Sequence, residues 1–375
     1  MRLQKFMSLL LSCIMLCLSF QANCLSIYAE ALSAAEPTTD SDGTQAWNKS
    51  LGTDAYPQFS GKAVSYISEH GEEVYSNTNI SCNNHSYVNG ICKTCGEYEV
   101  PTLENGAYQL SNYGELVWFQ QYVDADNTGA NAVLTADITA NKNLLKEDGS
   151  VSDVPVYKWV PIGRSLQYTG TFDGNGHIIS GLCCNDTRSY CGLFAKMKGT
   201  IKNLGIVDSY FGSEKCYHAA SFAGYAVEGS VIENCFSDSS VVGSMYCGGI
   251  VGQTTGKISN CYYIGKITAD STDSNAISSD KYNYGALENC YYLESCGLST
   301  TRAVGKTAEQ FASGDVCYIL KSSENNLVWG QNLSSEGSMP VLTSDEELRV
   351  YRVTTVKDDA SSSYYSNSSC TLPAD

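Results

Sequence analysis

Basic residues are scarce in this sequence. It has 23 Lys and Arg against 40 Asp and Glu, which gives a formal net charge of −17. An acidic surface of this kind repels nucleic acid and anionic membranes, so we expect neither as a partner. Histidine is rarer still, with four residues, and no two of them have the spacing of the H-E-x-x-H motif of zinc peptidases.

Long apolar runs are lacking after the first twenty residues. The run "FMSLLLSCIMLCLSF" (6–20) follows Arg2 and Lys5 and precedes the small-residue site Ala29-Glu30-Ala31. This order is typical of a secretory signal peptide, which we assign to residues 1–31. We therefore expect a protein that is secreted or retained at the cell surface, with no transmembrane span after cleavage.

A compact disulfide scaffold is also not expected. Three of the 17 cysteines lie in the predicted signal peptide, and the other fourteen are spread over a long chain. Their place within a sequence repeat explains them better than pairing does.

The repeat consists of Gly, an apolar residue, Asn and then Cys or Leu. It occurs as "GSVIENCF" (229–236), "GKISNCYY" (256–263) and "GALENCYY" (285–292), and the Asn positions are 31, 26 and 29 residues apart. The aligned residues are Asn203, Asn234, Asn260 and Asn289. Short apolar pieces separated by Gly and polar turns at this period predict an all-β fold, a parallel β-helix in which each repeat is one turn of a solenoid.

Stacking also explains the residue types. Equivalent residues in adjacent turns lie about 4.8 Å apart. We therefore expect the four Asn side chains to form a hydrogen-bonded ladder, and Cys235, Cys261 and Cys290 to form an interior column of small apolar groups. Under this interpretation the repeat is structural, and its cysteines are not catalytic.

The chain divides into six predicted segments. They are a signal peptide (1–31), a polar segment with a partial repeat-unit tail (32–81), a Cys/His-rich linker (82–99), the β-helix (105–305), a C-terminal capping unit (306–345) and a polar tail (346–375). Small helices should cap the solenoid: Asn112 with Glu115, and Thr307 with Gln310, have the spacing of helix N-terminal capping boxes.

The repeats "GLFAKMKGTIKNLGIV", "GYAVEGSVIENCF" and "GGIVGQTTGKISNCYYIGKI" resemble GLUG repeats of exported proteins from Gram-positive gut bacteria. With the flanking segments, the resemblance covers about residues 105–345. It implies a right-handed β-helix in an adhesin-like protein at the cell surface. Similar repeats are found in IgA1-specific metallopeptidases, whose H-E-x-x-H catalytic domain is absent from this sequence.

The segment "CNNHSYVNGICKTCGEYE" (82–99) holds four candidate metal ligands: Cys82, His85, Cys92 and Cys95. Two residues separate Cys82 from His85, and two separate Cys92 from Cys95. Four ligands of these types suit a structural tetrahedral zinc site. A disulfide, or thiols without a ligand, is the alternative. We expect no other cofactor.

Tyrosines of the repeats offer candidate ligand contacts. Tyr262, Tyr263, Tyr291 and Tyr292 could stack on sugar rings or contact a protein, or they could simply pack along the turns. The main functional hypothesis is a non-catalytic protein that binds host or matrix glycans or proteins. The alternatives are a polysaccharide lyase or hydrolase, which would need acidic residues that converge in a groove, and a passive spacer or truncated piece of a larger surface protein.

Overall fold

The structure is a computed structural model that describes residues 65–69, 72–76, 84–152, 157–185, 190–279, 285–321, 329–354 and 362–365. The chain forms two units, Met1–Asn83 and Asn84–Asp375. In the first, the described residues form an antiparallel hairpin of β1 (Ser65–Glu69) and β2 (Glu72–Ser76). The predicted signal peptide and Cys82 lie outside the described residues.

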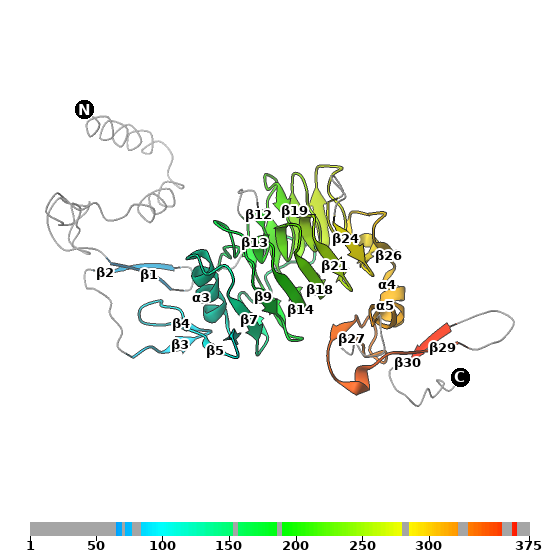
Figure 1. Cartoon of the computed structure of the whole chain (residues 1–375), viewed down its shortest axis with the longest axis horizontal. Coiled ribbons are helices and arrows are strands. Elements are labelled where there is room, and N and C mark those ends of the chain that lie inside the picture. The colour runs from blue at the N-terminus through cyan, green and yellow to red at the C-terminus, as the bar shows by residue number, and fades with distance from the viewer. Residues whose placement is uncertain are drawn as a thin grey trace. The chain divides into compact units, whose positions relative to one another are not determined.

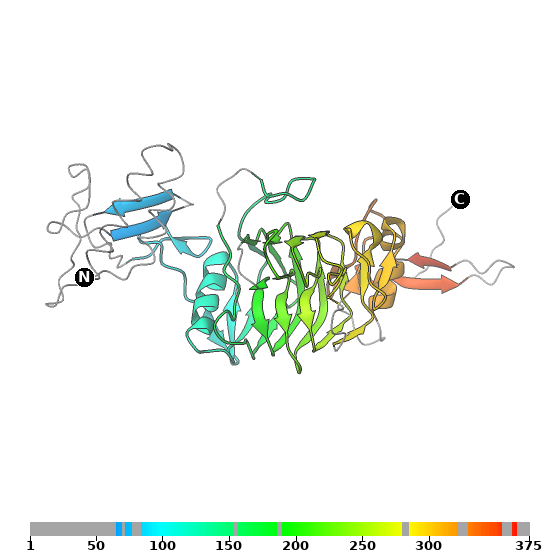
Figure 2. The same ribbon diagram turned by 90° about the horizontal axis from the view of Figure 1, so that it is seen from above.

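The second unit is a β-solenoid, as the repeat predicts. It has about six turns. Its strands pair in parallel with those of the next turn. The turns are stacked side by side between α3 (Tyr113–Asp124) at one end and α4 (Ala308–Ala312) and α5 (Asp315–Leu320) at the other (Figure 1; Figure 2). Within the described part of the chain, no helix has the length and apolar character needed to cross a membrane.

The solenoid has three main sheets. The largest contains β5 (Thr102–Glu104), β6 (Ala107–Leu110), β7 (Asn131–Leu134), β8 (Ile138–Thr139), β9 (Thr171–Asp173), β10 (Ile178–Ser180), β14 (Thr200–Val207), β18 (Val231–Ser237), β21 (Lys257–Ser259), β22 (Tyr262–Tyr263), β24 (Ala286–Glu288), β25 (Tyr291–Leu293) and β26 (Val304–Lys306). The second contains β11 (Cys183–Cys184), β15 (Tyr210–Gly212), β19 (Ser240–Gly243) and β23 (Lys266–Ala269). The third contains β13 (Phe194–Met197), β17 (Ala223–Ala226) and β20 (Val251–Thr254), beside the pair β12 (Tyr190–Cys191) and β16 (His218–Ala219).

Strand register confirms the predicted cysteine column. Leu204 pairs with Cys235, and Phe236 pairs with Tyr262, which places the Asn-Cys segments of successive turns above one another. Cys235, Cys261 and Cys290 are at most 3% exposed and belong to the same apolar core as Leu204. The structure describes twelve cysteines, and eleven of them are buried.

The asparagine ladder is confirmed in part, and the main role of these residues is in the backbone. Asn234 Nδ2 donates to Asn203 Oδ1 over 3.1 Å, and Asn289 Nδ2 donates to Asn260 Oδ1 over 2.7 Å. The middle step is missing, because the buried Asn234 Oδ1 has no partner. All four have φ of 52°, the left-handed region that Asn tolerates better than most residues, so each makes the same bend in its turn.

Both predicted helix starts are present. α3 (Tyr113–Asp124) begins at the N-cap Asn112, whose side chain accepts from Glu115 N–H. α4 (Ala308–Ala312) begins with the capping box of Thr307 and Gln310 and is followed by α5 (Asp315–Leu320). The remaining elements are β3 (Tyr87–Val88), β4 (Ile91–Cys92), η1 (Glu294–Cys296), β27 (Trp329–Gly330), β28 (Val341–Leu342), η2 (Glu346–Leu348), β29 (Tyr351–Thr354) and β30 (Ser362–Tyr365).

The C-terminal elements pack against the outer side of the largest sheet. Phe311 of α4, Trp329 of β27 and Leu342 of β28 form a second apolar core with Phe236 and Tyr262. Phe236, Tyr262 and Tyr291 are aligned on three successive turns. These C-terminal elements therefore contact several turns from outside the solenoid.

Candidate functional site

The Cys/His segment folds into a hairpin that gathers three of its predicted ligands. Strands β3 and β4 pair with Tyr87 opposite Cys92, and their two-residue turn is Asn89-Gly90, both at positive φ. This Asn-Gly turn is the preferred type for a tight hairpin. His85 precedes β3 and Cys92 ends β4, so the hairpin brings them together.

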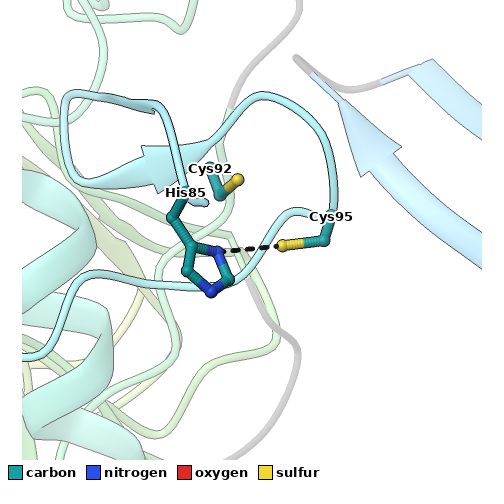
Figure 3. A group of neighbouring side chains, drawn as sticks. All are labelled: His85, Cys92 and Cys95. Atoms are coloured by element: carbon teal, nitrogen blue, oxygen red, sulfur yellow. Dashed lines mark hydrogen bonds between the residues drawn. The ribbon is translucent and has the colours of Figure 1, made fainter. Parts of the chain in front are cut away.

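A second tight turn adds Cys95. Gly96 N–H donates to the Cys92 carbonyl over 2.8 Å, and Gly96 has φ of 73°. The ligand atoms of His85, Cys92 and Cys95 all lie within 4.8 Å of one another. Cys95 Sγ is 3.4 Å from His85 Nδ1, and the three side chains face a common space (Figure 3).

The environment of Cys92 favours a thiolate. Burial alone would raise the pKa of this thiol, but hydrogen bonds from the backbone N–H groups of Cys95, Thr94 and Ser86 and from His85 outweigh it and lower the pKa to about 5. A thiolate is the form of cysteine that binds metals. Three described residues could therefore hold a metal such as zinc, and the fourth predicted ligand, Cys82, is outside the described residues.

The four tyrosines named as candidate ligand contacts are buried, which favours the alternative that they pack along the turns. Tyr262, Tyr263, Tyr291 and Tyr292 are between 0% and 7% exposed. Tyr262 and Tyr291 point outward but are covered by the C-terminal unit, whereas Tyr263 and Tyr292 point into the solenoid. Strand alternation already implied part of this: if Cys261 points inward, Tyr263 two residues later does too.

The structure leaves other aromatic residues of the repeats at the surface. The rings of Tyr190 and His218 stack with centroids 4.7 Å apart, and Tyr246 follows at 5.0 Å from His218. All three are half-buried. A sequence signal existed, because Tyr190-Cys191-Gly192 and Tyr246-Cys247-Gly248 repeat the same order one turn on either side of His218.

A second column runs beside the first. Lys196 pairs with Tyr225 and Tyr225 with Gln253 on β13, β17 and β20. The Lys196 ammonium lies 4.7 Å from the Tyr190 ring centre, and His218 Nε2 is 3.3 Å from Gln253 Oε1. We call these six residues, from three turns, the aromatic surface: Tyr190, Lys196, His218, Tyr225, Tyr246 and Gln253.

Asp173 and His177, close in sequence, do not form an acid/base pair with each other. Lys202 Nζ lies 3.3 Å from Asp173 Oδ2, and Asn203 Nδ2 donates to Asp173 Oδ1. His177 Nδ1 is instead 3.1 Å from Asp137 Oδ1. Among the described residues, His85, Cys92 and Cys95 are the one group of three His, Cys, Asp or Glu side chains with ligand atoms this close.

No family model matches the chain, and no curated protein matches it. Among solved structures, it is similar to a Bacteroides ovatus protein described as a "putative immunoglobulin A1 protease". The two are 19% identical, with a TM-score of 0.42, over 64% of this chain and 93% of the other.

Proposed function

We propose that this chain is an exported, non-catalytic β-helix protein that binds neutral glycans through its aromatic surface. The observation that carries the proposal is the row of half-buried Tyr, His, Lys and Gln side chains presented by three successive turns. Tyrosine and other polar aromatic groups supply contact area and hydrogen bonds at little entropic cost, which suits a hydroxyl-rich ligand.

The geometry also indicates how such a ligand would be held. The ring faces of Tyr190, His218 and Tyr246 are covered by one another and by Lys196, so a glycan meets ring edges and polar groups. The net charge of −17 disfavours sialylated or sulfated glycans.

Two carboxylates of the solenoid are held in ion pairs, which makes them poor candidates for the polysaccharide-degrading alternative. Asp173 is held by Lys202, and Glu288 Oε2 lies 2.7 Å from Lys257 Nζ. Carboxylates neutralised in this way are poor candidates for the paired acid and base of a glycosidase.

A glycan array with the chain lacking residues 1–31 tests the proposal. We expect saturable binding to neutral glycans, reduced at least tenfold by Tyr225→Ala or Gln253→Ala. Tyr122→Ala, which removes a half-buried tyrosine from α3, is the matched control and should leave binding unchanged. Binding that is equal in all variants, or restricted to anionic glycans, would reject the aromatic surface as the site. Binding to a protein ligand alone would replace the glycan by a protein partner.

A further inference from the structure

We propose that the Cys/His hairpin binds one zinc ion, and that this metal fixes the hairpin as a cap on helix α3 at the N-terminal end of the solenoid. The inference does not depend on the glycan proposal. It rests on the ligand geometry at the base of the hairpin and on the contacts at its tip.

One pair of ligand atoms has the separation that a tetrahedral zinc site requires, and Cys92 Sγ lies within 4.8 Å of the other two ligand atoms. Zn–S bonds of about 2.3 Å and Zn–N bonds of about 2.0–2.1 Å at tetrahedral angles place S and N about 3.5 Å apart. Cys95 Sγ and His85 Nδ1 are 3.4 Å apart. The backbone turns at Asn89-Gly90 and Gly96 hold this arrangement in place.

His85 is also oriented as a metal ligand. Its Nδ1 faces Cys95, and its Nε2 is 3.6 Å from Glu97 Oε2. In many zinc sites a carboxylate lies beside the second nitrogen of a ligating histidine and helps to orient the ring. The ring also stacks on Tyr87, with centroids 5.5 Å apart.

The tip of the same hairpin supplies hydrogen-bond acceptors to the start of α3. The first N–H groups of a helix have no partner within the helix. Here Asn89 Oδ1 accepts from Tyr113 N–H over 3.2 Å, and the Asn89 carbonyl accepts from Gly114 N–H over 2.9 Å. Asn112 caps the third, that of Glu115.

Further contacts join the hairpin to the solenoid. Asn89 Nδ2 donates to the Thr139 carbonyl of β8 over 2.8 Å, and Glu99, just after the hairpin, accepts from Asn112 Nδ2. Since Leu116 and Phe119 of α3 are fully buried in the solenoid core, ordering the hairpin also orders this end of the stack. A metal bound only to the folded hairpin stabilises the cap by mass action.

Titration of the reduced full chain with Co²⁺ and Zn²⁺ tests the first part. We expect one ion per chain, a thiolate-to-cobalt charge-transfer band, and displacement of Co²⁺ by Zn²⁺. Cys95→Ser and His85→Ala should each weaken binding at least a hundredfold, and Glu97→Gln about tenfold. His177→Ala changes a histidine outside the site and should bind as the unaltered chain does.

Hydrogen exchange of the Tyr113 and Gly114 amides tests the second part. Zinc should slow their exchange at least tenfold in the unaltered chain and leave it unchanged in Cys95→Ser. No bound ion, or equal binding in Cys95→Ser and His85→Ala, would overturn the metal site. Tight binding with no change at these two amides would overturn the capping role. A Cys92–Cys95 disulfide in protein that fails to bind zinc after reduction would assign the hairpin to a covalent crosslink instead.

Discussion

The backbone of Gly90 at the hairpin tip lies directly against the backbone of Gly114 in the first turn of α3. A Cβ on Gly114 would lie 1.9 Å from the Gly90 carbonyl oxygen. The contact explains why a residue with low helix propensity occupies a helical position. It also makes the docked hairpin sensitive to a single methyl group.

We expect Gly114→Ala to destabilise the protein by about 2 kcal/mol, as overpacking against a fixed backbone does. Helix propensity alone would favour Ala by about 1 kcal/mol, so the two effects have opposite signs. Urea denaturation followed by circular dichroism measures the difference. Gly129→Ala, whose Cβ would approach Thr169 Oγ1 at 3.6 Å, is the control and should change stability little. A more stable Gly114→Ala would show that the hairpin does not dock as described.

The buried Tyr262 should act on stability and not directly on ligand binding. It packs against Phe236, Phe311 and Trp329, and its hydroxyl donates to the Pro340 carbonyl. We expect Tyr262→Ala to cost about 4 kcal/mol and Tyr262→Phe about 1 kcal/mol in unfolding free energy. Tyr217→Ala, at a ring that is 50% exposed, should cost less than about 0.5 kcal/mol. Equal effects at Tyr262 and Tyr217 would contradict the packing of the C-terminal unit.

The repeated Asn positions should tolerate Gly better than Ala. Asn234 has φ of 52°, and a residue with a Cβ pays about 1–2 kcal/mol in this region. We therefore expect Asn234→Ala to be less stable than Asn234→Gly by about 1 kcal/mol. At the neighbouring Glu233, an ordinary strand position, the order should reverse by about 0.5 kcal/mol. Thermal or chemical denaturation of the four variants decides this, and the same order at both sites would reject the backbone explanation.

Alkaline pH should unfold the protein in a cooperative step. Burial raises the pKa of the Cys183 and Cys247 thiols from 9.0 to about 11, and that of Tyr291 from 10.0 to about 12. The unfolded chain releases these protons at lower pH than the folded one, so the stability they contribute is complete below about pH 9 and is lost as pH rises through 11 to 12. Thiolate and tyrosinate absorbance of the buried groups should rise together with the loss of circular dichroism. Ionisation of the buried groups well before unfolding would contradict their burial.

Local pattern and period were sufficient to predict the solenoid. The Asn spacing specified the parallel register that pairs Leu204 with Cys235, and the capping residues Asn112 and Thr307 marked both helix starts. The burial of Tyr262 could not be predicted in this way. The segment that covers it, with Trp329 and Leu342, lies more than sixty residues further along the chain. The docking of the hairpin on α3 was missed for the same reason: it depends on contacts between Asn89 and residues distant in sequence, not on a repeat.

The Asn-Cys-aromatic motif does not contain the residues of the aromatic surface. The motif favoured Tyr262 and Tyr291, whereas the half-buried rings at the surface, Tyr190 and Tyr246, belong to the segments that precede strands β13 and β20. Tyr190 of β12 comes just before the buried Cys191, so alternation along the strand directs it outward. Tyr246 comes just before the buried Cys247 and lies in a bend, with φ of 51°. For the Cys/His hairpin, sequence spacing identified three donors that the structure brings together, but it gave no sign that Asn89 would cap a helix.

The buried cysteines also place folding in competition with thiol oxidation. In the native chain eleven of the twelve described thiols are buried. In the unfolded chain these thiols are accessible, and a thiolate that meets an oxidant before folding can form a wrong crosslink. The cysteine column therefore requires that the turns assemble before the thiols are oxidised, or that folding takes place where oxygen is scarce.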